Sequence, residues 1–349
     1  MAAINGTGDD RMPRTGLGGG TVEITALSFG AAALGNLFRT VEPERAAATV
    51  DAAWDIGIRS FDTAPHYGLG LSERRLGAAL RLRPRDAYTL STKVGRLLDP
   101  LPPGARTAGP DGLSEGFAVP ATHRRRWDFS AAGVRRSIED SLDRLGLDRI
   151  DIAYLHDPDD HAEAAFREGY PELERLRAEG VVRAIGAGMN RTAMLTRFVR
   201  DTDVDVVLCA GRHTLLDQSA LDDLLPAAAA RGRSVVVGGV FNSGLLADPR
   251  PGATYDYTTA PPDLLDRALR IEAVTEAHGV PLRAAALHYP FRHPAVAGVL
   301  IGARTPDEVH DAAVQLEREI PDALWADLRE RSLLPGDGDA DGTDHGPRP

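Results

Sequence analysis

The stretch "IRSFDTAPHYGLGLSERRLGAAL" (58–80) contains one complete unit of a pattern that runs along most of the chain. It begins with the short apolar run "IRSFD" (58–62) and ends in a segment with the composition of a helix. In the loop between them, Gly68 and Gly70 let the chain turn, and Ser72 is the expected cap of the helix. The glycine run resembles a phosphate-binding loop, but the polar residues before it are the better candidates for chemistry.

Seven further apolar runs have the same character, and helical segments follow nearly all of the eight. Each run is rich in Val, Ile or Leu, as expected for strands covered on both faces. The runs occupy residues 24–30, 58–62, 87–93, 150–156, 182–188, 204–210, 234–239 and 296–303. Eight strand–helix units predict an α/β fold of the (β/α)8 TIM-barrel type. The alternative is an open doubly wound sheet, which usually has fewer strands in one domain.

Residues that favour helix ends lie where this division needs them. Pro43 suits the first turn of the helix that follows the first run. Ser130 is the expected cap of a helix that stops at Gly146.

The pattern also divides the chain into a core and two ends. Residues 1–13 are expected to form a flexible leader, 14–334 a single barrel domain, and 335–349 a disordered acidic tail rich in Gly, Pro and Asp. Two irregular segments, 95–129 and 239–262, follow the third and seventh strands. They should therefore lie over the C-terminal mouth of the barrel, where loops shape ligand sites.

Composition excludes several classes of function. The chain has 349 residues and a net charge of −11, without a dominant basic stripe, so a nucleic-acid partner is not expected. No apolar span reaches the length of a membrane helix, so no membrane partner is expected either. The one cysteine, Cys209, lies in the apolar run "VDVVLCA" and is expected to be a buried structural thiol, which fits a reducing cytoplasm. Histidine and cysteine spacings predict no metal site.

Two short motifs resemble functional signatures but lie in the wrong sequence context. "TGLGGG" (15–20) precedes the first strand, whereas a dinucleotide fingerprint follows one, so a hairpin turn is expected there. "GLSEG" (112–116) matches the nucleophile elbow of serine hydrolases but lies in a Pro-rich loop without the required strand and helix. We therefore interpret this match as chance.

Four polar residues lie at or just after the ends of consecutive strands: Asp62, Tyr67, Lys93 and His156. Each has a structural explanation when taken alone, such as a turn cap, a packing ring or a solvated strand end. Together, at the active-site end of a barrel, they form an acid–base device. Lys93 would lower the tyrosine pKa from ~10, and a shift of ~2 units needs about 2.7 kcal/mol. Asp62 would hold Lys93, and His156 would orient the substrate oxygen.

Three segments are similar to signature segments of the aldo-keto reductase family and stand in the same order. They are "GIRSFDTAPHYGLGLSERRLG" (57–77), "LSTKVGR" (90–96) and "DSLDRLGLDRIDIAYLHDPD" (140–159). The resemblance extends over most of the expected barrel domain. By this resemblance the four strand-end residues are the family's catalytic tetrad, with the tyrosine as proton donor or acceptor. The implied cofactor is a nicotinamide dinucleotide, NAD or NADP, bound at the barrel mouth without a Rossmann domain.

The resemblance also implies a set of cofactor-binding residues. Asn190 matches the asparagine that holds the nicotinamide amide, and "FNSGLL" (241–246) matches the diphosphate loop after the seventh strand. The implied set is Asp62, Asn190, Phe241, Asn242, Ser243, Gly244, Leu246, Gly302, Arg304, Thr305 and Glu308. Where many members place an aromatic ring under the nicotinamide, this chain has Gly238 and Gly239, so another group must support the ring.

The preference between NAD and NADP depends on the segment "IGARTPDEVHDA" (301–312). Members that prefer NADP carry a Lys and an Arg where this chain has Gly302 and Glu308. A carboxylate repels a 2′-phosphate and accepts hydrogen bonds from a free ribose hydroxyl, which favours NAD. Arg304 could instead pair with a phosphate or stack on adenine. Ala312 replaces an asparagine often found near the adenine.

Further segments resemble the branch of the family that oxidises cyclic hemiacetals to lactones. The resemblance therefore implies oxidation of the anomeric carbon of a fucose-like aldose, with a small sugar or aldehyde as the substrate. Oxidation of pyridoxal and general aldehyde or ketone reduction are the alternatives within the enzyme class. A non-catalytic cofactor-binding or regulatory protein on the same fold is the alternative of another class.

Overall fold

The structure, a computed structural model, describes residues 12–20, 22–102 and 113–336. The parts of the expected leader and tail at 1–11 and 337–349 lie outside the described residues. The last two residues of the expected leader are packed against the fold. The Met12 side chain is buried, and the Pro13 carbonyl accepts a hydrogen bond of 2.8 Å from the Ala26 amide.

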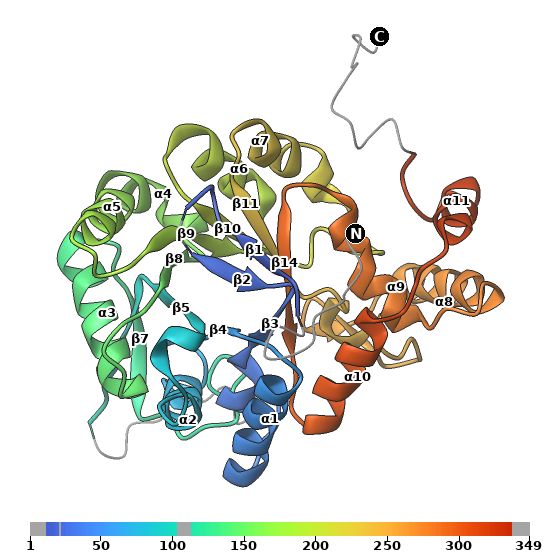
Figure 1. The fold of residues 1–349 in the computed structure, drawn as a ribbon. Helices are drawn as coiled ribbons and strands as arrows, with labels where there is room; N and C mark the ends of the chain where they lie inside the picture. The colour runs from blue at the N-terminus through green and yellow to red at the C-terminus, as the bar shows by residue number, and fades with distance from the viewer. Residues whose placement is uncertain (1–11, 21, 103–112, 337–349) are drawn as a thin grey trace.

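Eight parallel strands close into a barrel at the centre of the molecule (Figure 1). The strands are β3 (Leu27–Gly30), β4 (Ser60–Asp62), β5 (Thr89–Val94), β8 (Ile152–His156), β9 (Ala184–Met189), β10 (Val206–Ala210), β11 (Ser234–Gly238) and β14 (Val296–Gly302). They follow one another around the barrel in chain order, and the last strand pairs with the first. Each overlaps one of the eight apolar runs, so the TIM-barrel prediction is confirmed and the open sheet is excluded.

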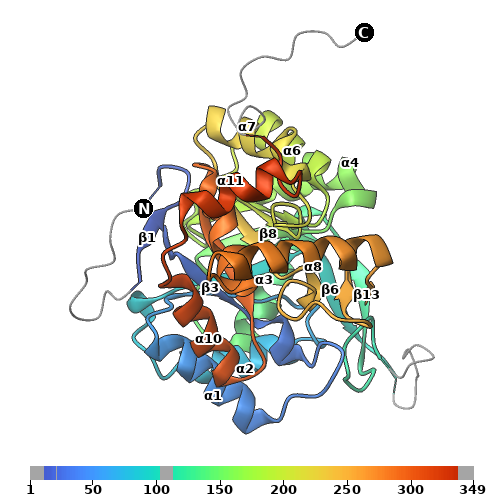
Figure 2. The ribbon, with the colours of Figure 1, turned by 90° about the vertical axis from the view of Figure 1, so that its right-hand side faces the viewer.

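Helices surround the barrel and cover its outer face (Figure 1). They are α1 (Pro43–Asp55), α2 (Leu71–Leu80), α3 (Ala131–Leu145), α4 (Ala162–Ala164), α5 (Tyr170–Ala178), α6 (Thr192–Asp201), α7 (Leu224–Ala230), α9 (Leu282–His288) and α10 (Pro306–Leu316). Two more, α8 (Pro262–Ala277) and α11 (Asp322–Glu330), contact each other outside the ring, on the face turned to the viewer in Figure 2. A second apolar cluster that includes Ile271 and Trp325 holds them there.

The predicted helix ends are confirmed with one exception. Pro43 opens α1, the Ser130 hydroxyl accepts a hydrogen bond of 3.1 Å from the Gly133 amide, and Gly146 ends α3 with φ 64°. Ser72 as a helix cap is wrong, because left-handed Gly70 begins the helix earlier and places Ser72 inside its first turn. Its hydroxyl instead donates to the carbonyl of Ala31 at 2.7 Å and ties the helix to the loop after β3.

A hairpin closes the barrel at the N-terminal ends of its strands. Its two strands, β1 (Arg14–Gly16) and β2 (Glu23–Thr25), are antiparallel and lie across the barrel in Figure 1. "TGLGGG" (15–20) forms the end of β1 and the turn that follows, as predicted. Leu17 and Ile24 of this hairpin pack in one apolar cluster with Tyr154 of the barrel wall. The barrel is therefore open to ligands at its other end.

Two short hairpins extend from the irregular segments at the C-terminal mouth. One pairs β6 (Arg96–Pro100) with β7 (His123–Trp127), and the other pairs β12 (Thr254–Tyr255) with β13 (Thr258–Thr259). Residues of both segments line the central cavity, so the prediction that these loops shape the mouth is confirmed.

Two residues that could be mistaken for nucleophiles have structural surroundings. Ser114 of the "GLSEG" match pairs with Phe117 in a tight turn, and its hydroxyl accepts a hydrogen bond of 2.9 Å from Arg125. Cys209 lies in β10 with no exposed surface, and burial raises the pKa of its thiol to about 12. The prediction of a buried structural thiol is therefore confirmed.

Candidate active site

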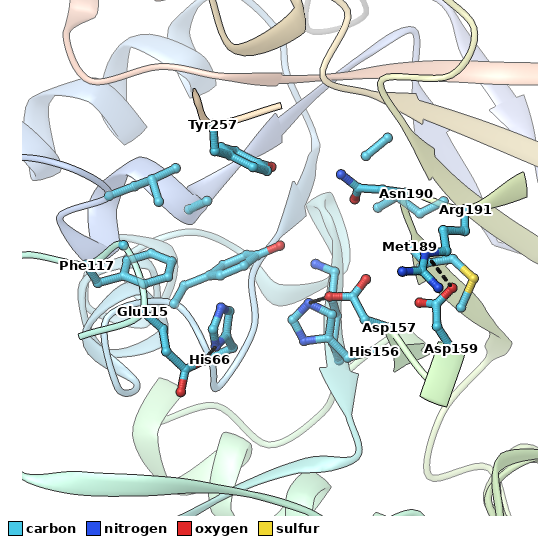
Figure 3. Close-up of a pocket in the computed structure, with 18 of the residues that line it drawn as sticks. His66, Glu115, Phe117, His156, Asp157, Asp159, Met189, Asn190, Arg191 and Tyr257 are labelled. Atoms are coloured by element: carbon cyan, nitrogen blue, oxygen red, sulfur yellow. Dashed lines mark ion pairs between the residues drawn. The ribbon is translucent and has the colours of Figure 1, made fainter. Parts of the chain in front are cut away.

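A cavity of about 560 Å³ lies at the C-terminal mouth of the barrel (Figure 3). Tyr67, Lys93 and His156 line it directly, and Asp62 lies against Lys93 at the end of β4. The structure therefore brings the four strand-end residues together. Among the cofactor residues implied by the resemblance, Asn190 also lines the cavity.

Lys93 and Asp62 form a buried ion pair at the base of the cavity. The Lys93 ammonium donates to Oδ2 of Asp62 at 2.5 Å and to the carbonyl of Thr63 at 3.1 Å. The Ser91 hydroxyl donates to the other carboxylate oxygen at 2.7 Å. Burial alone would lower the pKa of Lys93, but Asp62 and Tyr67 outweigh it and hold that pKa above its usual value. Lys93 is therefore a fixed cation at this point of the site.

Tyr67 projects into the cavity beside this cation. The ammonium of Lys93 lies 4.9 Å from the centre of the Tyr67 ring. The expected lowering of the tyrosine pKa is wrong for the protein alone, because burial raises the pKa of Tyr67 to about 12 while Lys93 opposes that rise. The cost of burying a phenolate is larger here than the attraction of the ammonium. Tyr67 thus holds its proton at neutral pH.

Two histidine rings complete the reacting end of the cavity. The ring centres of His66 and His156 are 5.6 Å apart, and those rings lie 6.0 Å and 5.9 Å from Tyr67. Burial, with help from nearby cations, lowers the pKa of His66 to about 2 and holds that of His156 well below its usual value. Both imidazoles are therefore neutral at physiological pH, and each can donate one hydrogen bond and accept one.

Aromatic rings and carboxylates share the rest of the lining. Phe117 packs against Tyr67, with ring centres 5.9 Å apart, and Phe38 contacts Tyr257 at the same separation. Glu115 and Phe117 lie on one side of Figure 3, and Asn190 and Asp159 lie on the other. The cavity thus offers apolar faces for carbon–hydrogen surfaces together with hydrogen-bond acceptors for hydroxyl groups.

Asp157 occupies a special position between these parts. It has a left-handed backbone with φ 41°, a conformation that is costly for a residue with a side chain. Its carboxylate lies 3.5 Å from Nε2 of His156 and pairs with the guanidinium of Arg96. Burial raises its pKa, although Arg96 opposes that rise. The turn after β8 therefore places an oriented acceptor directly beside His156.

The loop expected to bind a diphosphate borders the cavity without lining it. Amides of Asn242, Gly244, Leu245 and Leu246 donate hydrogen bonds within the turn, and Leu246 is fully buried in the core. The Ser243 hydroxyl accepts from the amide of Tyr257 at 3.2 Å, which connects the loop to a residue of the cavity wall. Nothing lies within 4 Å of the point where a side chain on Gly244 would begin, so this part of the loop is open.

The segment expected to contact the adenosine lies at the end of β14 and the start of α10. Thr305 caps that helix by accepting from the amide of Glu308 at 3.2 Å, and a Glu308 oxygen accepts from the amide of Arg304 at 2.7 Å. Arg304 reaches the carbonyl of Leu37, a cavity residue, at 3.5 Å. Burial lowers the pKa of Arg304, and the nearby charge of Arg39 lowers that pKa further. Gly302 ends the strand before this segment.

Several lining residues were not singled out from the sequence. His66 and Asp157 are direct neighbours of Tyr67 and His156, so their adjacency was an available signal. Glu115, Phe117 and Tyr257 come from the irregular segments, whose composition carries no spacing rule. Tyr257 and Asn190 both line the cavity and are labelled in Figure 3.

Among the described residues, no group of three or more His, Cys, Asp or Glu side chains is arranged to hold a metal ion. None of the described helices is both long and apolar enough to cross a membrane.

The chain matches known proteins over most of its length. A profile of the Aldo/keto reductase family matches residues 26–332. A D-threo-aldose 1-dehydrogenase from Pseudomonas sp is 49% identical over 315 residues, which cover 89% of this chain and 95% of the relative. A pyridoxal 4-dehydrogenase from Microbacterium luteolum is 40% identical over 336 residues, covering 92% of this chain and 96% of the relative.

A solved structure has the same architecture. An aldo-keto reductase from Bacillus halodurans in its holo form superposes with a TM-score of 0.70 at 26% identity, covering 91% of this chain and 96% of the other. The sequence resemblance and the barrel therefore agree.

Proposed function

This chain belongs to the aldo/keto reductase family and is an NAD(P)-dependent oxidoreductase, and from this premise we propose that it oxidises the anomeric carbon of a fucose-like aldose to the lactone. The relative at 49% identity is named for oxidation of D-threo-aldoses at this carbon. The observation that carries the proposal is the lining of the cavity. A buried acid–base group stands at its base, and three carboxylates, Glu115, Asp157 and Asp159, surround it.

The carboxylates favour a polyol as substrate. Each carboxylate can accept hydrogen bonds from hydroxyl groups while it is also paired with an arginine. Phe117 and Tyr257 offer ring faces that pack against the carbon–hydrogen surface of a pyranose. The proposed substrate class is therefore a polyhydroxylated aldose.

The chain's own residues supply binding and proton transfer. The phenolate of Tyr67, which is the minor form at neutral pH, accepts the proton of the anomeric hydroxyl during oxidation, and the protonated form returns it in the reverse direction. Lys93 offsets the burial cost of the phenolate, and Asp62 keeps the ammonium in place. His156, neutral and next to Tyr67, holds the reacting oxygen by a hydrogen bond.

The residues present fit a nicotinamide dinucleotide, which accepts the hydride from the anomeric carbon when it is bound. Among the described residues, the side-chain oxygen of Asn242 and Nε of Arg304 are buried without hydrogen-bond partners. Both belong to the segments implied to hold the cofactor, and Gly244, two residues after Asn242, is open. We propose that Asn190 holds the nicotinamide amide and that Ser243 and Arg304 hold the phosphate groups. Gly238 and Gly239 have no ring to stack under the nicotinamide, and we propose that Tyr257 supplies this ring instead.

Oxidation of pyridoxal is the second candidate. The relative at 40% identity is named for it, and the aromatic side of the cavity would also suit a pyridine ring. General aldehyde reduction would need no carboxylates around the reacting end. A non-catalytic role would not explain why the Lys93–Asp62 ion pair is buried beside Tyr67.

A panel of substrates tests the proposed function. We expect production of reduced nicotinamide, followed by its absorbance, with L-fucose and NAD at a kcat/KM at least about tenfold above that with pyridoxal, a difference of ~1.4 kcal/mol. Absence of turnover with every aldose would refute the proposal, and faster turnover of pyridoxal would favour the second candidate.

The cofactor preference has its own test at Glu308. We propose that its carboxylate disfavours the 2′-phosphate of NADP, so the wild type should prefer NAD. The variant Glu308→Gln keeps an acceptor for the Arg304 amide but loses the charge, and the ratio of the Kd for NADP to that for NAD should fall about tenfold (~1.4 kcal/mol). Asp307→Asn, one residue earlier in the same helix turn, should leave the ratio unchanged. An unchanged ratio in Glu308→Gln would show that Glu308 does not distinguish the 2′-phosphate of NADP from the 2′-hydroxyl of NAD.

A further inference from the structure

His66 is a polar group at the reacting end of the cavity that the proton-transfer scheme does not use. It lines the cavity, and its ring forms a triangle with Tyr67 and His156, with ring centres 5.6 to 6.0 Å apart. Its Nδ1 is buried and has no hydrogen-bond partner among the described residues. A buried unpartnered nitrogen is costly, so its surroundings indicate how the ring is used.

Glu115 is the acceptor that faces this nitrogen. Its carboxylate lies 3.8 Å from Nδ1 of His66, just beyond hydrogen-bond distance, and 3.5 Å from the guanidinium of Arg125. Arg125 also donates to the carbonyl of His66 at 3.0 Å and to that of Ser114 at 3.2 Å. This arginine therefore holds the turn that carries Glu115 against the backbone of His66.

The nearby carboxylate decides which nitrogen of the neutral ring carries the proton. A proton on Nδ1 faces Glu115 favourably, whereas a lone pair there would be repelled by it. Nε2 of His66 then has a free lone pair and makes no hydrogen bond with a described residue. This nitrogen can accept a hydrogen bond from a substrate hydroxyl but cannot bond to an ether oxygen, which has no proton to give.

The triangle indicates which hydroxyl this is. The proposed function puts the reacting oxygen between Tyr67 and His156, and the third corner of the triangle is His66. A group at that corner meets the atoms beside the reacting carbon. In a pyranose the two candidate oxygens are the ring oxygen, which is bonded to the reacting carbon itself, and the 2-hydroxyl on the adjacent carbon, and only the hydroxyl can donate.

We propose that Nε2 of His66 accepts a hydrogen bond from the hydroxyl on the carbon adjacent to the reacting carbon, and so selects 2-hydroxylated substrates. This inference rests on the proposed function for the position of the reacting oxygen. It makes His66 a substrate-binding residue, and it makes Glu115 and Arg125 positioning residues that fix its tautomer.

Paired substrates test the inference through a ratio rather than through activity alone. The kcat/KM for L-fucose is divided by that for 2-deoxy-L-fucose in the wild type, in His66→Phe and in His161→Phe. The wild-type ratio should exceed that of His66→Phe by about fivefold to tenfold, the value of one hydrogen bond of ~1 kcal/mol. The intrinsic reactivity of the two sugars cancels in this comparison. His161, which packs against Trp127 and does not line the cavity, provides the matched control and should keep the wild-type ratio.

A second pair separates this inference from the proposed function. Lactaldehyde and propanal differ by the same hydroxyl and can be tested in the direction of reduction. If no aldose is oxidised, the proposed function fails, but the ratio of kcat/KM for lactaldehyde to that for propanal still decides whether His66 binds the hydroxyl. His66→Gln retains an acceptor and should keep part of the ratio, and cofactor Kd and melting temperature show that each variant is folded. An equal ratio in wild type and His66→Phe for the reactive pair, or no reaction with either pair, overturns the inference.

Discussion

Replacement of Tyr67 by Phe is expected to reduce kcat about 10³-fold, because positioned acid–base groups contribute roughly 10²–10⁴ to the rate. The change removes one hydroxyl and leaves a ring that keeps its contacts with Phe117 and His156. The fold and cofactor binding should therefore persist, as melting temperature and titration of nicotinamide fluorescence would show. Tyr88→Phe is the matched control, because Tyr88 is buried at the opposite end of the barrel and its hydroxyl has no described partner. More than about a tenth of wild-type kcat in Tyr67→Phe would exclude Tyr67 as the proton-transfer group.

The raised pKa of Tyr67 gives the same prediction a pH dependence. With a pKa of about 12, the phenolate that accepts the substrate proton is the minor form at neutral pH, and its fraction rises about tenfold per pH unit below that pKa. The kcat/KM for oxidation should therefore rise from pH 6 to pH 9, whereas reduction, which uses the protonated form, should stay level. His66 and His156 are neutral throughout this range and add no step. A profile of oxidation that is level from pH 6 to pH 9 would contradict the role given to Tyr67.

The sequence was a good guide to the barrel because its strands are read from local composition. Every strand of a parallel barrel is covered on both faces, so each appears as a continuous apolar run whatever its partners. The same property makes strand ends visible, and the four candidate residues were found at those ends. Their gathering in space then follows from the fold, since all strands of a barrel point to one mouth.

The lining that selects a substrate could not be derived in the same way. Glu115 and Tyr257 both have left-handed backbones, with φ 49° and 66°, in segments without periodicity. Such positions depend on distant contacts, for example that of Arg125 with the carbonyl of His66, which no local pattern reveals. The pKa of Tyr67 could not be predicted from the sequence either, because the balance between burial and the nearby ammonium depends on how deeply the ring is enclosed.

Composition held one further signal about the site. Lys93 is the only lysine in the chain, and every other basic side chain of the 40 Lys and Arg residues is an arginine. Arginine is a planar, wider cation that binds carboxylates through a rigid fork of donors, whereas lysine presents a compact ammonium. A position that keeps lysine in such a chain is one where a point charge fits and a guanidinium does not. The enclosure of Lys93 between Asp62 and the carbonyl of Thr63 gives the physical reason.

Replacement of Lys93 by Met should therefore lower both stability and activity. The variant leaves Asp62 buried without its cation, and breaking a buried pair from one side costs about 3–5 kcal/mol. The melting temperature should fall by roughly 10 °C for a domain of this size. The rate should fall about 10³-fold, because the ammonium no longer offsets the burial cost of the phenolate of Tyr67.

Second variants separate these two effects of Lys93. Adding Asp62→Asn to Lys93→Met removes the uncompensated charge and should restore most of the lost stability without restoring the rate. Lys93→Arg keeps the charge but should remain at least about 10²-fold slow, since the guanidinium cannot occupy the space of the ammonium. Arg83→Lys, in an exposed pair with Asp51, is the matched control and should change neither quantity. If Lys93→Arg reached wild-type kcat, the argument for a compact point charge beside Tyr67 would fail, and positive charge alone would account for the role of this residue.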